Sequence, residues 1–87
     1  MPKESHWTYV AMRHKEKTTG EIWYTIHELY SSGFIKKRKR SWTDTGIMPI
    51  GDTLSDLRST LKMMARDVYR NPVFDFETGE IVREKNV

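Results

Sequence analysis

Apolar residues between positions 54 and 68 recur at spacings of three and four, which places them along one side of an α-helix. They are Leu54, Leu57, Leu61, Met64 and Val68. Thr53 stands at the N-cap position, and Asn71-Pro72 ends the pattern because the residue before a proline disfavours helical backbone angles. We expect this stripe to be buried against a sheet, with Leu57 and Leu61 at its centre, because nothing else in the chain is large enough to cover it.

The first half of the sequence has the composition of β-strands. Residues 7–14, 21–30 and 34–43 are rich in β-branched and aromatic side chains, and Gly20 and Gly33 stand in the polar segments between them. Such short connections favour an antiparallel β-meander. With the helix packed on one face and a short return strand within residues 73–82, the sequence predicts an α+β fold.

The 87 residues are expected to form a single domain, 1–87, with an ordered core at about 6–82 and a disordered tail at 83–87. The chain has no cysteine, so neither a disulfide nor a thiolate metal site supplements its small core. No stretch has the length and apolar character of a secretory leader or a membrane span. We therefore expect a cytoplasmic protein.

Five consecutive basic residues interrupt the third predicted strand, and residues 1–44 as a whole hold nine Lys or Arg against five Asp or Glu. Alternation along a strand leaves neither face of this run free to be buried, so it belongs at an edge or in a projecting hairpin. One interpretation is edge protection against aggregation. The other is a phosphate-binding ridge beside a stacking aromatic ring. Its candidate nucleic-acid-binding residues are Lys36, Lys37, Arg38, Lys39, Arg40 and Trp42.

A single helix covers only one face of the predicted sheet, so the other face exposes aromatic side chains. Trp7, Tyr9, Trp23 and Tyr30 are the candidates for this surface. Exposed apolar patches commonly mark partner surfaces, and pairing of two copies about a two-fold axis is the simplest closure. The sequence therefore also predicts a homodimer or adaptor interface.

No convergent catalytic or cofactor motif is present, so we expect no enzyme, no cofactor, no metal and no small-molecule ligand. His27 is expected to be a partly buried, hydrogen-bonded residue of its strand. A remote alternative is a ribonuclease site built from Arg13, His14 and Glu28. Asp75 and Glu77 are better explained by turn chemistry than by metal binding.

Three motifs resemble a group of short, uncharacterised bacterial and phage proteins. They are the strand Ile26-His27-Glu28-Leu29-Tyr30, the segment Pro49-Ile50-Gly51-Asp52-Thr53 before the helix, and Asn71-Pro72-Val73 after it. The segment 51–57 is also similar to the helix start of HicB-type antitoxins, whose N-terminal domain resembles part of ribonuclease H. These resemblances imply an order of elements but no defined activity.

The sequence thus favours a nucleic-acid-binding accessory protein that uses a basic edge strand in a weak, sequence-tolerant manner. The alternative is a homodimeric or adaptor protein–protein interaction module of phage or bacterial origin. A small ribonuclease or a toxin–antitoxin component is the remote alternative. No membrane partner is expected.

Overall fold

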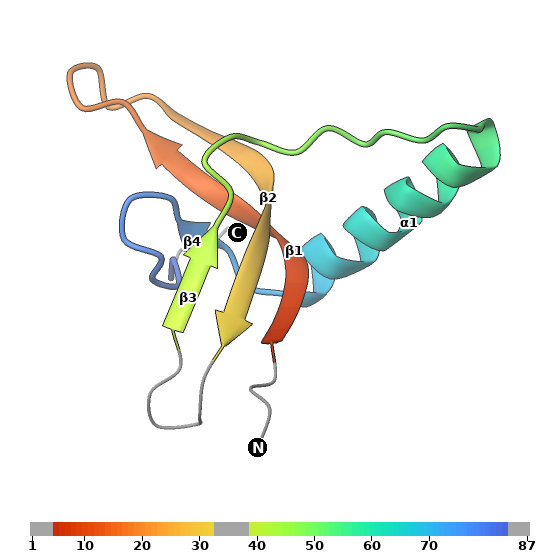
Figure 1. Ribbon diagram of the computed structural model, residues 1–87. Helices are drawn as coiled ribbons and strands as arrows, with labels where there is room; N and C mark the ends of the chain where they lie inside the picture. The colour runs from red at the N-terminus through yellow and green to blue at the C-terminus, as the bar shows by residue number, and fades with distance from the viewer. Residues whose placement is uncertain (1–4, 33–38, 84–87) are drawn as a thin grey trace.

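The structure is a computed structural model that describes residues 5–32 and 39–83. Its elements follow the chain as β1 (Ser5–Lys15), β2 (Ile22–Ser32), β3 (Lys39–Trp42), α1 (Leu54–Arg70) and β4 (Phe74–Asp75) (Figure 1). One helix packs against a mixed four-stranded sheet, so the predicted α+β class is confirmed. Residues 84–87 of the predicted disordered tail, and residues 34–38 of the predicted third strand, lie outside the described residues.

The strands lie in the order β3-β2-β1-β4. The pairs β1/β2 and β2/β3 are antiparallel, which confirms the predicted meander. The return strand β4 pairs with β1 in parallel, because the chain crosses through α1 before it rejoins the sheet. Gly20 forms the turn of the first hairpin with a φ of 75°, a backbone conformation that glycine adopts without steric cost.

The two sides of the sheet carry different side chains. The core face, which bears Val10, Met12 and Leu29, packs against Phe74 to form the hydrophobic core. The opposite side, here called the helix face, bears Tyr9, Ala11 and Ile26 among others. The loop after β4 returns across the core face, and Trp42 fixes it there by donating its indole N–H to the carbonyl of Phe76 at 3.1 Å.

Helix α1 begins and ends where the sequence predicts. The Thr53 hydroxyl accepts the backbone N–H of Asp56 at 3.1 Å, which is the expected N-cap bond. At the other end Asn71 is the C-cap, with extended backbone angles, directly before Pro72. Both boundaries therefore follow from local side-chain chemistry.

The predicted burial of the helical stripe is correct only for its C-terminal part. Met64 is 2% exposed and Val68 is half-buried, whereas Leu61 is 47% and Leu54 is 60% exposed. Leu57 is half-buried, so the expectation that Leu57 and Leu61 form the centre of the buried stripe is wrong. The physical reason is that α1 diverges from the sheet, and its N-terminal end is the part farthest away (Figure 1).

A polar anchor fixes the C-terminal end of α1 to the edge of β1. The backbone N–H of Tyr9 donates to the Asp67 carboxylate at 3.3 Å, and the Asn71 side-chain amide donates to the Tyr9 carbonyl at 3.1 Å. Burial opposes ionisation of Asp67, but the Tyr9 N–H and the nearby Arg66 guanidinium outweigh it and lower the pKa of this carboxyl. Both outward backbone groups of Tyr9 are thus satisfied by side chains of α1 and its C-cap rather than by a neighbouring strand.

Candidate functional site

The predicted phosphate-binding ridge is only partly within the described residues. Lys36, Lys37 and Arg38 lie outside them, and Lys39 begins β3, an outer strand of the described sheet. Arg40 donates to the carbonyl of Gly79 at 3.2 Å, and its guanidinium carbon lies 5.3 Å from the centre of the Phe74 ring. These contacts are internal to the protein.

Trp42, the predicted stacking platform of the ridge, packs against the hydrophobic core instead of standing free. Its ring is half-buried and its only polar group is bonded to Phe76. Sequence reasoning missed this role because the partner lies 34 positions away. The candidate ridge therefore lacks the free stacking platform that the sequence predicted for it.

The four aromatic residues assigned to one partner surface do not share a face. Trp7 and Tyr30 are cross-strand partners on the helix face, with Tyr9 beside Trp7 at a ring-centroid distance of 5.2 Å. Trp23 pairs with His14 on the core side, because residues an odd number of positions apart on one strand point to opposite faces. Tyr9 is only 8% exposed. Of the four, only Trp7 and Tyr30 are both exposed and on one face, and that face is the helix face rather than the uncovered face that the sequence predicted.

A chain of hydrogen bonds links the two strand histidines through Thr25. Thr25 Oγ1 lies 2.7 Å from His14 Nε2 and 2.6 Å from His27 Nε2, and His27 Nδ1 lies 2.9 Å from the Thr43 carbonyl. Because a carbonyl only accepts, His27 Nδ1 is the donor to Thr43, and because the Thr25 hydroxyl has a single proton, at least one of the two Nε2 atoms donates to it. Both ring nitrogens of His27 are hydrogen-bonded, as predicted, but the residue is fully buried rather than partly buried.

The His14 ring lies between two aromatic rings. Its centroid is 5.1 Å from that of Trp23 and 4.4 Å from that of Phe76, and both pairs are stacked. Burial, followed by the proximity of His27, lowers the pKa of His14. Stacking on two rings and the hydrogen bond to Thr25 make His14 a packing element of the core face.

The remote ribonuclease alternative needs three groups on one side of the sheet. Arg13 and Glu28 point to the helix face, whereas His14 points to the core face. The sheet therefore separates the proposed cation and acid from the proposed base. Within residues 5–32 and 39–83, no three His, Cys, Asp or Glu side chains are grouped in a way that suits a metal ion.

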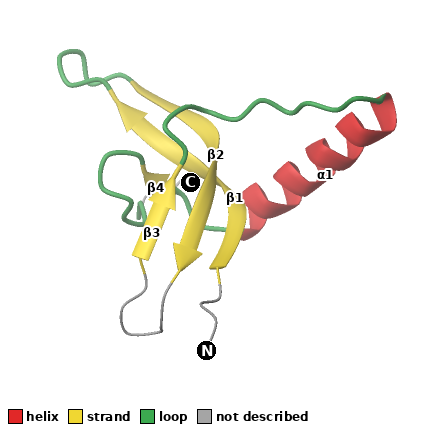
Figure 2. Ribbon diagram, in the orientation of Figure 1, coloured by secondary structure: helices red, strands yellow, loops and turns green. Residues whose placement is uncertain are grey.

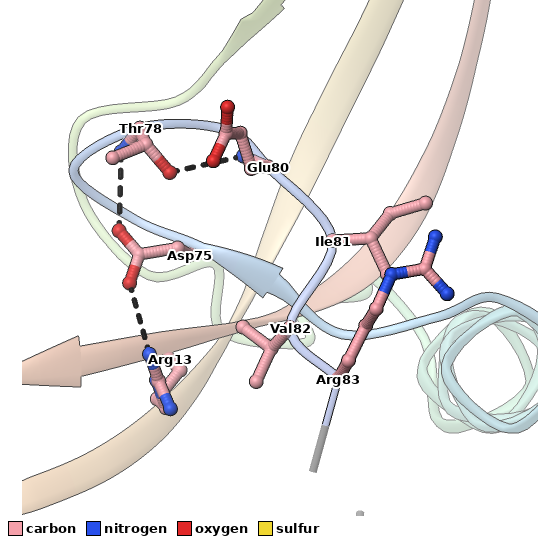
Figure 3. A pocket seen from close by; sticks show the side chains of 7 residues that line it. All are labelled: Arg13, Asp75, Thr78, Glu80, Ile81, Val82 and Arg83. Atoms are coloured by element: carbon pink, nitrogen blue, oxygen red, sulfur yellow. Dashed lines mark hydrogen bonds and ion pairs between the residues drawn. The ribbon is translucent and has the colours of Figure 1, made fainter.

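Asp75 organises the turn that follows β4, in a polar pocket of 350 Å³ (Figure 3). Its carboxylate accepts the backbone N–H groups of Glu77 at 2.9 Å and Thr78 at 3.1 Å, and Arg13 donates to it at 3.4 Å. Burial opposes ionisation, but these donors outweigh it and lower the pKa of Asp75. The bonds fix the loop over the sheet, which agrees with the predicted turn chemistry.

An open groove of 490 Å³ lies between the helix face, the connection before α1 and the C-terminal part of α1. Most of its lining is apolar, and we call it the apolar groove: Ala11, Tyr24, Ile26, Ile47, Met48 and Val68. Ile47 is tethered to β2, since its backbone N–H donates to the Ile26 carbonyl at 2.7 Å. The groove is thus formed by fixed elements.

The stripe of α1 continues beyond the apolar groove without a cover. Leu54 and Leu61 are exposed, and in the extended connection before α1 Met48 is 72% and Ile50 is 77% exposed (Figure 2). We call Leu54, Leu57 and Leu61 the free stripe. In the described part of the chain, no helix has the length and apolar character needed to cross a membrane.

Comparison of the chain with protein-family models, with curated proteins and with solved structures found no match. The resemblances stated from the sequence motifs therefore stay predictions. Function has to be inferred from the surfaces just described.

Proposed function

We propose that the protein is a non-enzymatic protein–protein interaction module whose binding surface combines the apolar groove with the free stripe of α1. The observation that carries this proposal is that Leu54 and Leu61 of the free stripe are exposed, and Leu57 is only half-buried, next to an open apolar groove. Contiguous apolar surface of this kind marks interaction sites in soluble proteins.

The size of the core supports the proposal. Among the described residues only six hydrophobic side chains are buried: Tyr9, Val10, Met12, Leu29, Met64 and Phe74. Most of the free stripe and of the connection before α1 contributes nothing to this core. Because apolar burial is the main favourable term in folding, a partner that covers these side chains adds stability as well as specificity.

Site-specific labelling tests the proposal, and the absence of natural cysteines makes it clean. Leu61→Cys places a thiol on the free stripe, and Ser59→Cys places one on the opposite side of the same exposed turn. We expect a thiol reagent applied to cells that naturally produce the protein to modify position 61 at least several-fold more slowly than position 59. Equal rates in cells would contradict the proposed function.

A second candidate function rests on a different observation. Five consecutive basic residues fill the end of the β2–β3 connection and the start of β3, and such a run attracts phosphate groups. Lys36, Lys37 and Arg38 lie outside the described residues, so their part in binding is predicted from the sequence alone. We propose weak, sequence-tolerant binding of single-stranded nucleic acid as an additional activity of this segment.

Its test is the salt dependence of binding to random single-stranded RNA and DNA. If three phosphates are neutralised, log affinity falls against log salt with a slope of about −2. The triple change of Lys36, Lys37 and Arg38 to Ser should remove most of this slope. A control that replaces Lys15, Lys17 and Lys62 with Ser removes the same charge elsewhere and should preserve it. An unchanged slope in the first triple variant would assign the basic run to edge protection.

A further inference from the structure

We infer that the partner of the apolar groove is the free stripe of a second copy of this chain, so that two copies exchange the N-terminal halves of α1. The inference rests on the proposed function, because it names the occupant of the same surface. Each copy then supplies a helix to its partner and receives one in return. Such a reciprocal contact closes about a two-fold axis.

The chain carries two surfaces that could pack on each other, the apolar groove and the free stripe, but that do not do so within one copy. The free stripe continues the side of α1 that, through Met64 and Val68, already packs on the helix face. The side of α1 that packs on the sheet at the C-terminal end has the same apolar character at the N-terminal end. The apolar groove is therefore chemically matched to the free stripe.

The same chain is held away from making that contact itself. Asp67 and Asn71 bind α1 to the edge of β1, and Ile47 binds the preceding connection to β2. Between these two attachments the helix, about 25 Å long for its 17 residues, rises away from the sheet (Figure 1). Gly51 adds to the constraint, since even a Cβ at this position would collide with the Leu57 backbone.

The surface of the isolated chain is too large for a compact monomer. It exposes 7280 Å², whereas a compact protein of 10.3 kDa exposes roughly 5,400 Å². Its radius of gyration is 14.5 Å, against about 12 Å expected for 87 residues. Both quantities are for the whole chain. The excess of roughly 1,900 Å² includes the surface of the residues outside the described ranges, and the roughly 800 Å² that each partner buries in a standard interface is less than half of it.

The occupant is a second copy rather than an unrelated protein because both complementary surfaces are already present on this chain. An unrelated protein would have to supply its own apolar surface for both the apolar groove and the free stripe. Helix exchange covers both surfaces with one contact made twice. Helix exchange requires no molecule other than this chain.

Cross-linking between two different single-cysteine variants tests the arrangement. Leu61→Cys mixed with Tyr24→Cys places one thiol on the free stripe and one in the apolar groove of another copy. We expect mild oxidation to give the mixed disulfide at least tenfold faster than for Ser59→Cys mixed with Tyr24→Cys. Equal rates for the two mixtures would overturn the exchange.

Light scattering of the unmodified protein keeps the inference testable if Leu61→Cys weakens the dimer. At about 0.1 mM, well above the dissociation constant of a stable dimer, we expect twice the chain mass of 10.3 kDa. A monomeric mass would overturn the inference. If the purified protein is monomeric but position 61 is protected from the thiol reagent in cells, the proposed interaction module stands with a different partner. If the purified protein is monomeric and position 61 is not protected in cells, both proposals fail.

Discussion

Gly79→Ala is expected to lower the free energy of unfolding by about 2–4 kcal/mol. Gly79 has a φ of 74°, where an alanine costs about 1 kcal/mol. The new Cβ would also lie 2.5 Å from two carbons of the Trp42 ring, and overpacking of this kind costs about 1–3 kcal/mol more. Trp42 cannot move aside freely because its indole N–H is bonded to Phe76. Chemical denaturation at fixed protein concentration measures the loss.

Gly20→Ala is the matched control. Its φ of 75° is nearly the same, but no atom lies within 4 Å of the added Cβ. We expect a loss of only about 1 kcal/mol, the backbone term alone. Equal losses for the two variants would contradict the packing of the 76–82 loop against Trp42.

Met64→Ala is expected to cost about 2–5 kcal/mol, the usual range for truncating a buried methionine. Met64 is 2% exposed and is the only hydrophobic residue of α1 that is fully buried among the described residues. In a domain of this size such a loss is a large fraction of the total stability. Thermal or chemical denaturation gives the value.

Met63→Ala makes the same chemical change one position earlier, where the side chain is 39% exposed. The two variants gain the same helix propensity, so the difference between them isolates packing. We expect Met63→Ala to change stability by less than about 1 kcal/mol. A larger loss for Met63→Ala than for Met64→Ala would mean that the other side of α1 faces the sheet.

The boundaries of α1 and the first hairpin were predictable because their signals are local. Thr53 accepts a bond three residues away, Pro72 excludes helix from the residue before it, and Gly20 supplies the positive φ of its turn. Each of these effects acts within a few residues. They specify where an element begins and ends, but not how elements are placed.

The extent of helix packing was not predictable from periodicity. A spacing of three and four identifies which residues share a side, and Leu61 does lie on the same side as Met64. How much of that side contacts the sheet depends on the anchor at Asp67, which positions α1. In the sequence, a single acidic residue in a helix does not indicate a bond to a strand edge. The exposed Leu61 is the result of that non-local contact.

The candidate surfaces show the same division. Trp23 and Tyr30 are seven positions apart on one strand, so alternation alone already separates them. In contrast, the internal contacts of Arg40 and Trp42 depend on a loop more than thirty positions later. Strand periodicity is sufficient to place Trp23 and Tyr30 on opposite faces, but it has no bearing on the contacts of Arg40 and Trp42.

The return of the loop after β4 across the core face has a consequence for the order of folding. Its two fixing bonds, from Trp42 to Phe76 and from Arg40 to Gly79, join residues 34 and 39 positions apart. Helix α1 forms through contacts four residues apart, on a timescale of microseconds or less. Bringing distant segments together costs loop entropy before any contact repays it. The slowest step in reaching the native state is therefore expected to be the closure of this loop, with α1 already formed.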